Sequence, residues 1–208
     1  TTEIQKDTTF VGIADLPVHI DSTAYLVHPI GNVALNQGWR KEMYKSSRYT
    51  GQSFSTSNYS GYRLSGNLSN VLFQHIESDT LTPLTDKVIR INAMTFLHEV
   101  YKETGKQIFM YEINDLDTNL DKKLDYNDIN SLFISNIDGS SFKKLTENNR
   151  EVINWRIVPV LNRLYYRTVE DSNKDGVFNN TDKMHYKYVN LSSPKLDIVE
   201  YFPLENIN

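Results

Sequence analysis

The residues best suited to chemistry in this chain are the oxygen-bearing side chains of a twelve-residue stretch, DSNKDGVFNNTD, at 171 to 182. Calcium takes six to eight oxygen ligands, and a twelve-residue loop can offer them from positions 1, 3, 5, 7, 9 and 12. Gly176 stands at the sixth position, where such a loop turns sharply and glycine adopts a positive φ without strain. The expected ligands are Asp171, Asn173, Asp175, the carbonyl of Val177, Asn179 and Asp182.

A second stretch, DTNLDKKLDYND at 117 to 128, repeats this pattern 54 residues earlier. Its sixth position is Lys122, where a left-handed backbone costs about 1–2 kcal/mol. Both stretches end in Asp, one methylene shorter than the Glu that closes most loops of this kind, as in dockerin-like loops. The expected ligands are Asp117, Asn119, Asp121, the carbonyl of Lys123, Asp125 and Asp128.

Two other interpretations of these stretches compete with calcium. Asp, Asn and Gly are ordinary turn formers, so both could be plain acidic turns. Magnesium is a weaker candidate because it prefers few carboxylates and several waters. Since two complete matches fall in register within one internal repeat, we expect two Ca²⁺ sites.

The sequence contains no motif for a cysteine, zinc or serine catalytic site. There is no cysteine, and the five histidines stand singly without an H-E-x-x-H pair. The nearest string to a serine elbow, GQSFS at 51 to 55, ends in Ser where Gly is required. We therefore predict no catalytic residue, and we expect His75 and His185 to be ordinary strand histidines.

Composition bounds the class of protein. The chain has 208 residues, of which 39% are hydrophobic and 23% charged, which fits one compact domain. A formal net charge of −4 argues against a nucleic-acid or anionic-membrane partner. No apolar run reaches the length of a membrane span. The polar start TTEIQKDTTF lacks signal-peptide features, so we expect a mature or trimmed form.

The segments around both stretches predict strands. Thirteen Tyr and nine Phe, with many β-branched residues, favour a mainly β protein. Short aromatic and β-branched runs precede the two stretches at 107 to 113 and 163 to 169, and follow them at 131 to 137 and 185 to 191. Neither flank carries a helical apolar stripe, so both stretches should connect strands.

Internal repeats extend this pattern along the chain. VLFQHIESDTLTPLT (71 to 85) matches SLFISNIDGSSFKKLT (131 to 146), and further strands are expected at 89 to 100 and 151 to 161. Units of about four strands in 50 to 60 residues are typical of propeller blades. The predicted fold is a mainly β, single domain (1–208) of repeated four-stranded antiparallel units, forming a small or incomplete β-propeller.

The expected division of this domain has four parts. Residues 1–9 form a flexible tail, and units span 10–85, 88–146 and 151–204. The first unit contains a long segment, 39–62, expected to be a mobile connection or a ligand-contacting loop. Its connection SGNLS (65 to 69) is too short for six ligands and should bind no ion.

Two resemblances suggest a family and an address. SLFISNIDGSSFKKLT resembles the strand, turn and strand of TolB-type propeller repeats, in which a DG turn precedes a closing Leu-Thr. The region from TGKQIFMYEI to NRLYYRTVEDSNKDGVF is similar to uncharacterised secreted or lipid-anchored proteins of the Bacteroidetes and flavobacteria. That likeness implies an extracytoplasmic location, in the periplasm or cell envelope, with anchoring through a removed N-terminal segment as one option.

The expected function is a calcium-binding, extracytoplasmic β-repeat module that binds or scaffolds an unknown protein, peptide or glycan. The alternative is an envelope hydrolase acting on glycans or peptides. Trp39, Trp155 and the tyrosines could form a sugar-stacking platform, although sheets enrich aromatic residues through packing alone.

Overall fold

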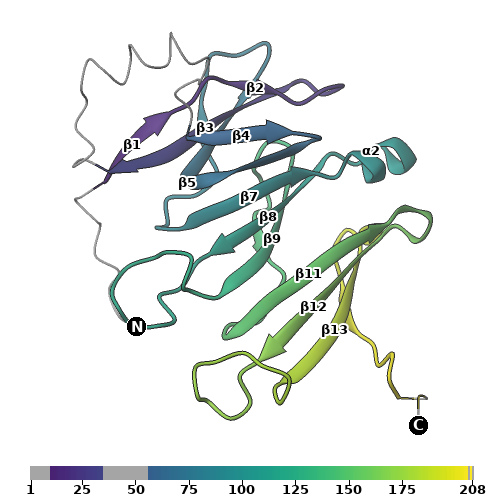
Figure 1. Ribbon diagram of the computed structural model, residues 1–208. Helices are drawn as coiled ribbons and strands as arrows, with labels where there is room; N and C mark the ends of the chain where they lie inside the picture. Colours follow the sequence, from purple (N-terminus) through teal and green to yellow (C-terminus); the bar gives the residue numbers. More distant parts are fainter. Residues whose placement is uncertain (1–9, 35–55, 206, 208) are drawn as a thin grey trace.

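The chain folds as a mainly β protein built from antiparallel sheets, as predicted. The computed structural model describes residues 10–34, 56–205 and 207 (Figure 1). The elements are β1 (Phe10–Ala14), β2 (Val18–His19), β3 (Tyr25–Ala34), β4 (Ser57–Ser60), β5 (Arg63–His75), β6 (Thr82–Pro83), β7 (Arg90–Phe96), α2 (His98–Thr104), β8 (Ile108–Asn114), β9 (Asn130–Asn136), β10 (Lys143–Lys144), β11 (Arg150–Val158), the 3-10 helix η1 (Pro159–Leu161), β12 (Arg163–Glu170), β13 (Lys183–Asn190) and β14 (Ile198–Glu200).

The first sheet follows the order β1-β3-β5-β7-β8-β9-β10, with β2, β4 and β6 pairing alongside. Its longest strand is β5, which pairs with β3, β4, β6 and β7. The second half of β5 pairs with β3, whereas residues 63 to 68 pair with β7. A register shift between Ser65 and Leu68 separates the two halves. Gly66 lies in this irregular stretch, where a Cβ would stand 2.5 Å from the Thr56 carbonyl oxygen, so glycine lets the chain before β4 approach β5.

The second sheet is a four-stranded meander in the order β11-β12-β13-β14. Alternate residues of β12 and β13 are buried and half-buried over most of their length, as expected for a sheet with one face against the core. Neither sheet closes on itself within the described residues. This C-terminal meander matches the predicted four-stranded antiparallel unit in its strand order.

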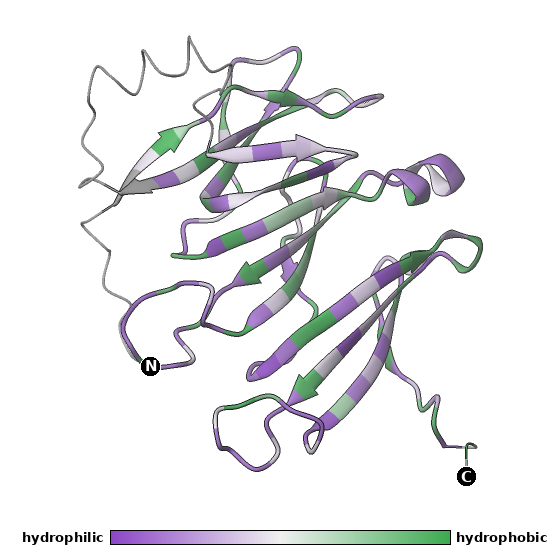
Figure 2. Cartoon of the chain, in the orientation of Figure 1, coloured by the Kyte–Doolittle hydropathy of each residue, from purple (hydrophilic) through white to green (hydrophobic). Residues whose placement is uncertain are grey.

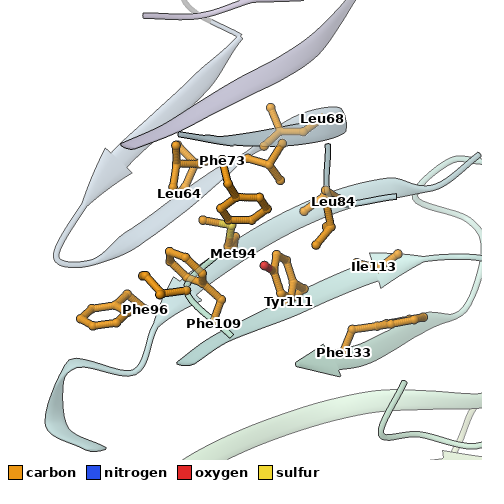
Figure 3. Packing of buried hydrophobic residues seen from close by; sticks show 14 of the residues in the cluster. Leu64, Leu68, Phe73, Leu84, Met94, Phe96, Phe109, Tyr111, Ile113 and Phe133 are labelled. Carbon is orange, nitrogen blue, oxygen red and sulfur yellow. The ribbon is translucent and has the colours of Figure 1, made fainter. Parts of the chain in front are cut away.

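The strands pack as three layers, formed by β3 and β5, by β7–β9 and by the second sheet. A hydrophobic cluster lies between each neighbouring pair. One cluster packs β3 and β5 onto one face of β7–β9 and includes Phe73, Phe109 and Tyr111 (Figure 3). The second packs the other face of β8 and β9 onto the second sheet and includes Met110 and Leu164. Strand β8 is therefore buried on both faces, since its alternate residues enter different clusters. Fully burying each such side chain stabilises the fold by about 1.5–3 kcal/mol.

Several local expectations differ from the structure. The expected connection at 65–69 lies inside β5, because the pairing with β3 and β7 continues through the bulge. The expected strand at 89–100 ends at Phe96 and continues as α2, which Gly105 closes with a φ of 73°. The expected strand at 151–161 ends at Val158, where Pro159 begins η1.

The predicted tail 1–9, Trp39 and most of the predicted loop 39–62 lie outside the described residues. The end of that loop, which was expected to be irregular, forms β4 and its turn into β5. No helix in the described parts of the chain is long and apolar enough to span a bilayer.

Candidate metal centres

Both twelve-residue stretches connect neighbouring antiparallel strands, which confirms the prediction that strands flank them. Loop 1 (residues 117–128) joins β8 to β9, and loop 2 (residues 171–182) joins β12 to β13. The two loops project from the same end of the molecule (Figure 1), and both are largely hydrophilic (Figure 2). Glu151 links their stems, since it pairs with Val169 of β12 and its carboxylate accepts a hydrogen bond from the Asn130 N–H, at 2.8 Å.

The first half of loop 1 is organised by side-chain oxygens at its first, third and fifth positions. The Asp117 carboxylate accepts the N–H groups of Asp121 (3.1 Å) and Lys122 (2.9 Å). The Asn119 Oδ1 also accepts the Asp121 N–H, at 3.0 Å. The Asp121 Oδ1 accepts the Lys123 N–H, at 2.8 Å. Three of the predicted ligands therefore gather around one short piece of backbone.

Loop 2 repeats this scheme one residue for one, 54 positions later. The Asp171 carboxylate accepts the N–H groups of Asp175 (3.2 Å) and Gly176 (2.9 Å). The Asn173 Oδ1 accepts the Asp175 N–H at 3.0 Å, and the Asp175 Oδ1 accepts the Val177 N–H at 2.8 Å. The same donors and acceptors are used in both loops, so their first halves have one architecture.

The twelfth residue closes each loop from a buried position. In loop 1 the Asp128 Oδ1 accepts the Thr118 N–H (2.7 Å) and hydroxyl (3.1 Å) and the Asn119 N–H (3.4 Å), while Oδ2 accepts the Asp125 N–H (2.9 Å). Only 4% of Asp128 is exposed. This carboxylate therefore ties the second, third and ninth positions to the stem.

Loop 2 closes in the same way with fewer bonds. The Asp182 Oδ1 accepts the Ser172 N–H and Oδ2 accepts the Asn179 N–H, both at 2.9 Å. Asp182 is 8% exposed. The Asn179 Oδ1 caps the Thr181 N–H (2.9 Å), and its amide donates to the Val177 carbonyl (3.2 Å). In loop 1 the ninth residue caps the eleventh as well, through a 2.8 Å bond from the Asn127 N–H to the Asp125 Oδ1.

The backbone turns at the same two positions in both loops. The fourth residues, Leu120 and Lys174, have φ values of 63° and 60°. The sixth residues, Lys122 and Gly176, have φ values of 68° and 78°. Lys122 therefore adopts the left-handed conformation that the sequence pattern implied, although a lysine there is strained.

The predicted ligands are all oxygens, which suit a hard cation such as Ca²⁺. Their side chains do not converge on one point in either loop. Among the described residues, no three or more His, Cys, Asp or Glu side chains gather closely enough to hold a metal ion. A carboxylate has about four lone-pair positions. Each Asp171 oxygen accepts one N–H, which leaves capacity on both for a cation. Asp128 has less capacity left, because its Oδ1 already accepts three donors.

A hydroxyl residue at the second position was missed from the sequence. The Thr118 Oγ1 accepts the Ile129 N–H at 2.9 Å, and the Ser172 Oγ accepts the Lys183 N–H at 3.0 Å. Each hydroxyl therefore fastens the start of its loop to the residue after its end. A signal was present, since both copies carry Ser or Thr at this position.

Beneath loop 1 lies a polar network that loop 2 lacks. Asn114, which is 1% exposed, donates to the Asp128 carbonyl at 2.7 Å and accepts from Arg90 (3.0 Å) and Asn92 (2.9 Å). Burial lowers the pKa of Arg90, and nearby Asp125 and Asp128 partly offset that effect. The residue at the place of Asn114 in the second copy is Thr168, whose buried hydroxyl has no hydrogen-bond partner.

Beside the stem of loop 2 lies a charged cluster instead. His185, which is 4% exposed, places Nδ1 2.9 Å from the Glu200 Oε1 and Nε2 2.8 Å from the Glu170 Oε2. The ring can donate to both carboxylates only when both nitrogens carry protons. The hydrogen bonds to His185 lower the pKa of both glutamates. The predicted strand histidine is thus in β13 but at the centre of an ionic cluster.

That cluster continues through Arg150, which lies 3.2 Å from Glu170 and 3.3 Å from Glu147. Lys187 is also ion-paired with Glu147. Each of these charged side chains therefore has an oppositely charged partner within the cluster.

Two surface cavities lie elsewhere. One, of about 430 Å³, is lined by Lys106, by residues of β8 and β9 that include Ser135, and by the segment 191–196. The other, of about 420 Å³, lies between β3, β5 and the turn after β9 and includes His75 and Asp138. Neither is lined by a predicted calcium ligand or by the His185 cluster. Among the described residues, no hydrogen bond or ion pair joins His75 to Asp138, and His75 lies 4.0 Å from Glu77 instead.

Comparison with known proteins gives little. No family model and no curated protein matches the chain. One solved structure, of a candidate TolB protein from Agrobacterium tumefaciens, aligns with 92% of this chain and 81% of its own at 10% identity, with a TM-score of 0.25. Because this TM-score is low, we assign neither a fold family nor a function from it.

Proposed function

We propose that the chain is a calcium-binding β-repeat module that works outside the cytoplasm, where it binds or scaffolds another molecule. The observation that carries this proposal is the agreement between the two loops. Each offers oxygens at positions 1, 3, 5, 9 and 12, and in both loops these side chains accept backbone N–H groups from matching positions.

A bound calcium ion would further stabilise the loop conformation that these hydrogen bonds already hold. Loop 1 carries four carboxylates and loop 2 three within twelve residues, and the repulsion between like charges opposes a compact loop. A Ca²⁺ ion bound by them would remove that repulsion and stiffen the end of the molecule where both loops project. The residues that would hold it are those predicted from the sequence: Asp117, Asn119, Asp121, Lys123 (carbonyl), Asp125 and Asp128 in loop 1, and Asp171, Asn173, Asp175, Val177 (carbonyl), Asn179 and Asp182 in loop 2.

The proposed location follows from ion supply. A site with a dissociation constant near 10⁻⁵ M would stabilise the fold by about 2.7 kcal/mol at a hundredfold excess of calcium. Extracellular loops of this kind bind at about 10⁻⁴ to 10⁻³ M, which submicromolar cytosolic calcium would leave empty. We therefore propose that calcium is a constitutive structural ion in the periplasm or cell envelope. We also propose that the three layers are arranged like the blades of a propeller.

The hydrolase alternative has less support. Its strongest candidate, His185, is 4% exposed and bonded to two glutamates, so neither ring nitrogen is available to a substrate. We do not propose a second function.

Thermal melting of the metal-stripped chain tests the calcium proposal. Restoring millimolar calcium should raise the melting temperature. Asp171→Ala should remove much of the rise, and Asp117→Ala the rest. The matched control is Asp138→Ala, which removes a half-buried turn carboxylate outside both loops; like the loop aspartates, it accepts a backbone N–H. An unchanged melting curve on addition of calcium would refute the proposal.

A further inference from the structure

The outer face of the C-terminal sheet carries cations that no acid neutralises. Arg156 on β11 and Arg163 and Arg167 on β12 have no carboxylate within 4.0 Å among the described residues, whereas Arg63 and Arg150 are ion-paired. The strand segments 154–158, 163–167 and 186–190 contain no acidic residue. The chain as a whole has a formal net charge of −4, so this face is opposite in sign to the molecule as a whole.

The register assigns these arginines to the side facing away from the other layers. Leu164 and Tyr166 of β12 belong to the core shared with β8 and β9. Alternate residues of a strand point to opposite faces, so Arg163 and Arg167 lie on the other side. Arg156 joins them, since it is paired with Tyr165. In Figure 1 the second sheet lies at one end of the molecule, below β8 and β9.

Two of the arginines are held in place by neutral groups. The Arg163 guanidinium lies 4.2 Å from the ring centroid of Tyr188, and its Nη1 donates to the Tyr165 hydroxyl at 3.1 Å. The Arg167 Nε donates to the Asn154 Oδ1 at 2.8 Å. Neutral partners fix a guanidinium without cancelling its charge. Both groups are therefore preordered to meet an anion, which lowers the entropy lost on binding.

Tyrosines cover the neighbouring half of the same face. The rings of Tyr165, Tyr186, Tyr188 and Tyr201 contact one another, with centroids 5.4 to 6.2 Å apart. All four side chains remain half-buried. Tyr and Arg are enriched at protein–protein interfaces and dominate their binding energy, whereas Lys, Asp and Glu are depleted there. The composition of this face matches that of an interface to another protein.

We propose that this Arg–Tyr face, formed by Asn154, Arg156, Arg163, Tyr165, Arg167, Tyr186, Tyr188 and Tyr201, binds an acidic segment of a protein partner. Asp and Glu side chains of that segment would pair with the three guanidiniums, and its apolar groups would lie on the tyrosines. Complementary charge would steer the encounter and fix the register. The inference rests on the proposed binding module in naming its partner, but it uses no residue of either loop.

A fluorescein-labelled peptide of ten glutamates is a suitable probe, with binding followed by fluorescence anisotropy at low salt in millimolar calcium. Arg163→Gln combined with Arg167→Gln should weaken binding at least about tenfold, the loss expected for two charge-assisted contacts. The matched control combines Lys87→Gln with Lys102→Gln, which makes the same change of charge on other elements and should weaken binding less than about twofold. Arg163→Lys with Arg167→Lys keeps the charge but loses the planar fork and should fall between them.

The inference would be overturned by no saturable binding of the peptide, by an equal loss in the lysine control, or by tighter binding of polygalacturonate or an oligonucleotide than of the peptide. Concentration-dependent self-association that Arg163→Gln abolishes would also contradict it, because the occupant would then be a second copy. Melting curves with and without calcium separate the two proposals. The arginine variant should keep the full rise in melting temperature on addition of calcium. If neither wild type nor this variant shows that rise, the calcium sites are refuted and the Arg–Tyr face is not.

Discussion

Loop 1 has Lys122 at the sixth position and loop 2 has Gly176, yet the backbone of both loops turns there with a positive φ. Their side-chain oxygens at positions 1, 3, 5 and 12 accept matching backbone N–H groups. The oxygens therefore determine the loop, and glycine only lowers its strain. A search that demanded glycine at the sixth position would miss loop 1.

The two loops differ more in what lies beneath them. Loop 1 rests on the buried amide of Asn114, which joins it to Arg90 and Asn92. Loop 2 rests beside Thr168, whose hydroxyl lacks a partner, and beside the ionic cluster of His185. We infer that loop 1 is the more rigid of the two without metal, and that loop 2 gains more order from an ion.

The largest expected difference is in the twelfth residue. Asp128→Ala removes four hydrogen bonds from a buried site and should lower the free energy of unfolding by about 2–3 kcal/mol without metal. Asp182→Ala removes two and should lower it by about 1–2 kcal/mol. Urea unfolding in a chelator measures both. Asp121→Ala, at an exposed position, is the control, and a larger loss for Asp182→Ala than for Asp128→Ala would contradict the comparison.

Two glutamates beside the loop stems, Glu200 and Glu151, should make the stability of the fold depend on pH in opposite directions. The hydrogen bond to His185 lowers the pKa of Glu200 in the folded state. Its stabilisation is therefore present above the unfolded pKa of about 4.3 and is lost as the pH falls through the folded pKa. Burial instead raises the pKa of Glu151, so its contribution is full below about 4.3 and is lost as the pH rises through the folded pKa.

Unfolding free energies at pH 7 and pH 3 check these signs. Glu200→Gln should destabilise the fold at pH 7 and have little effect at pH 3. Glu151→Gln keeps an acceptor for the Asn130 N–H and removes a buried charge, so it should be neutral or stabilising at pH 7. Equal destabilisation by both variants at pH 7 would show that the stems do not differ in this way.

The smallest expected effect concerns the sixth position. A Cβ at Gly176 meets no atom within 4 Å, so Gly176→Ala should cost only the strain of its φ, about 1 kcal/mol. Lys122→Gly should relieve similar strain but increase the freedom of the unfolded chain, for a net gain of about 0.5 kcal/mol. Thermal melting of the two variants in a chelator should move in opposite directions. A fall in both would mean that Lys122 makes contacts that outweigh its strain.

The sequence was sufficient for the features that depend on local pattern. The strands around both loops, the turn at the sixth position and the side-chain oxygens at positions 1, 3, 5, 9 and 12 follow from side-chain type and spacing along a few residues. Strand β8 also follows, because a short apolar run such as IFMY is typical of a strand buried on both faces.

Features that depend on distant contacts could not be predicted. The continuous β5 requires pairing with both β3 and β7, and neither partner is visible in the SGNLS segment itself. The bonds of His185 to Glu170 and Glu200 each join residues 15 positions apart on neighbouring strands. The network of Arg90, Asn92 and Asn114 likewise appears only once β7 and β8 pair.

Calcium stoichiometry, measured by isothermal titration of the metal-stripped chain, tests the central claim most directly. We expect two ions per chain in wild type, one after Asp117→Ala, one after Asp171→Ala, and none when both substitutions are combined. Two ions that survive the double substitution would place the sites elsewhere, and no heat of binding at millimolar calcium would contradict the account.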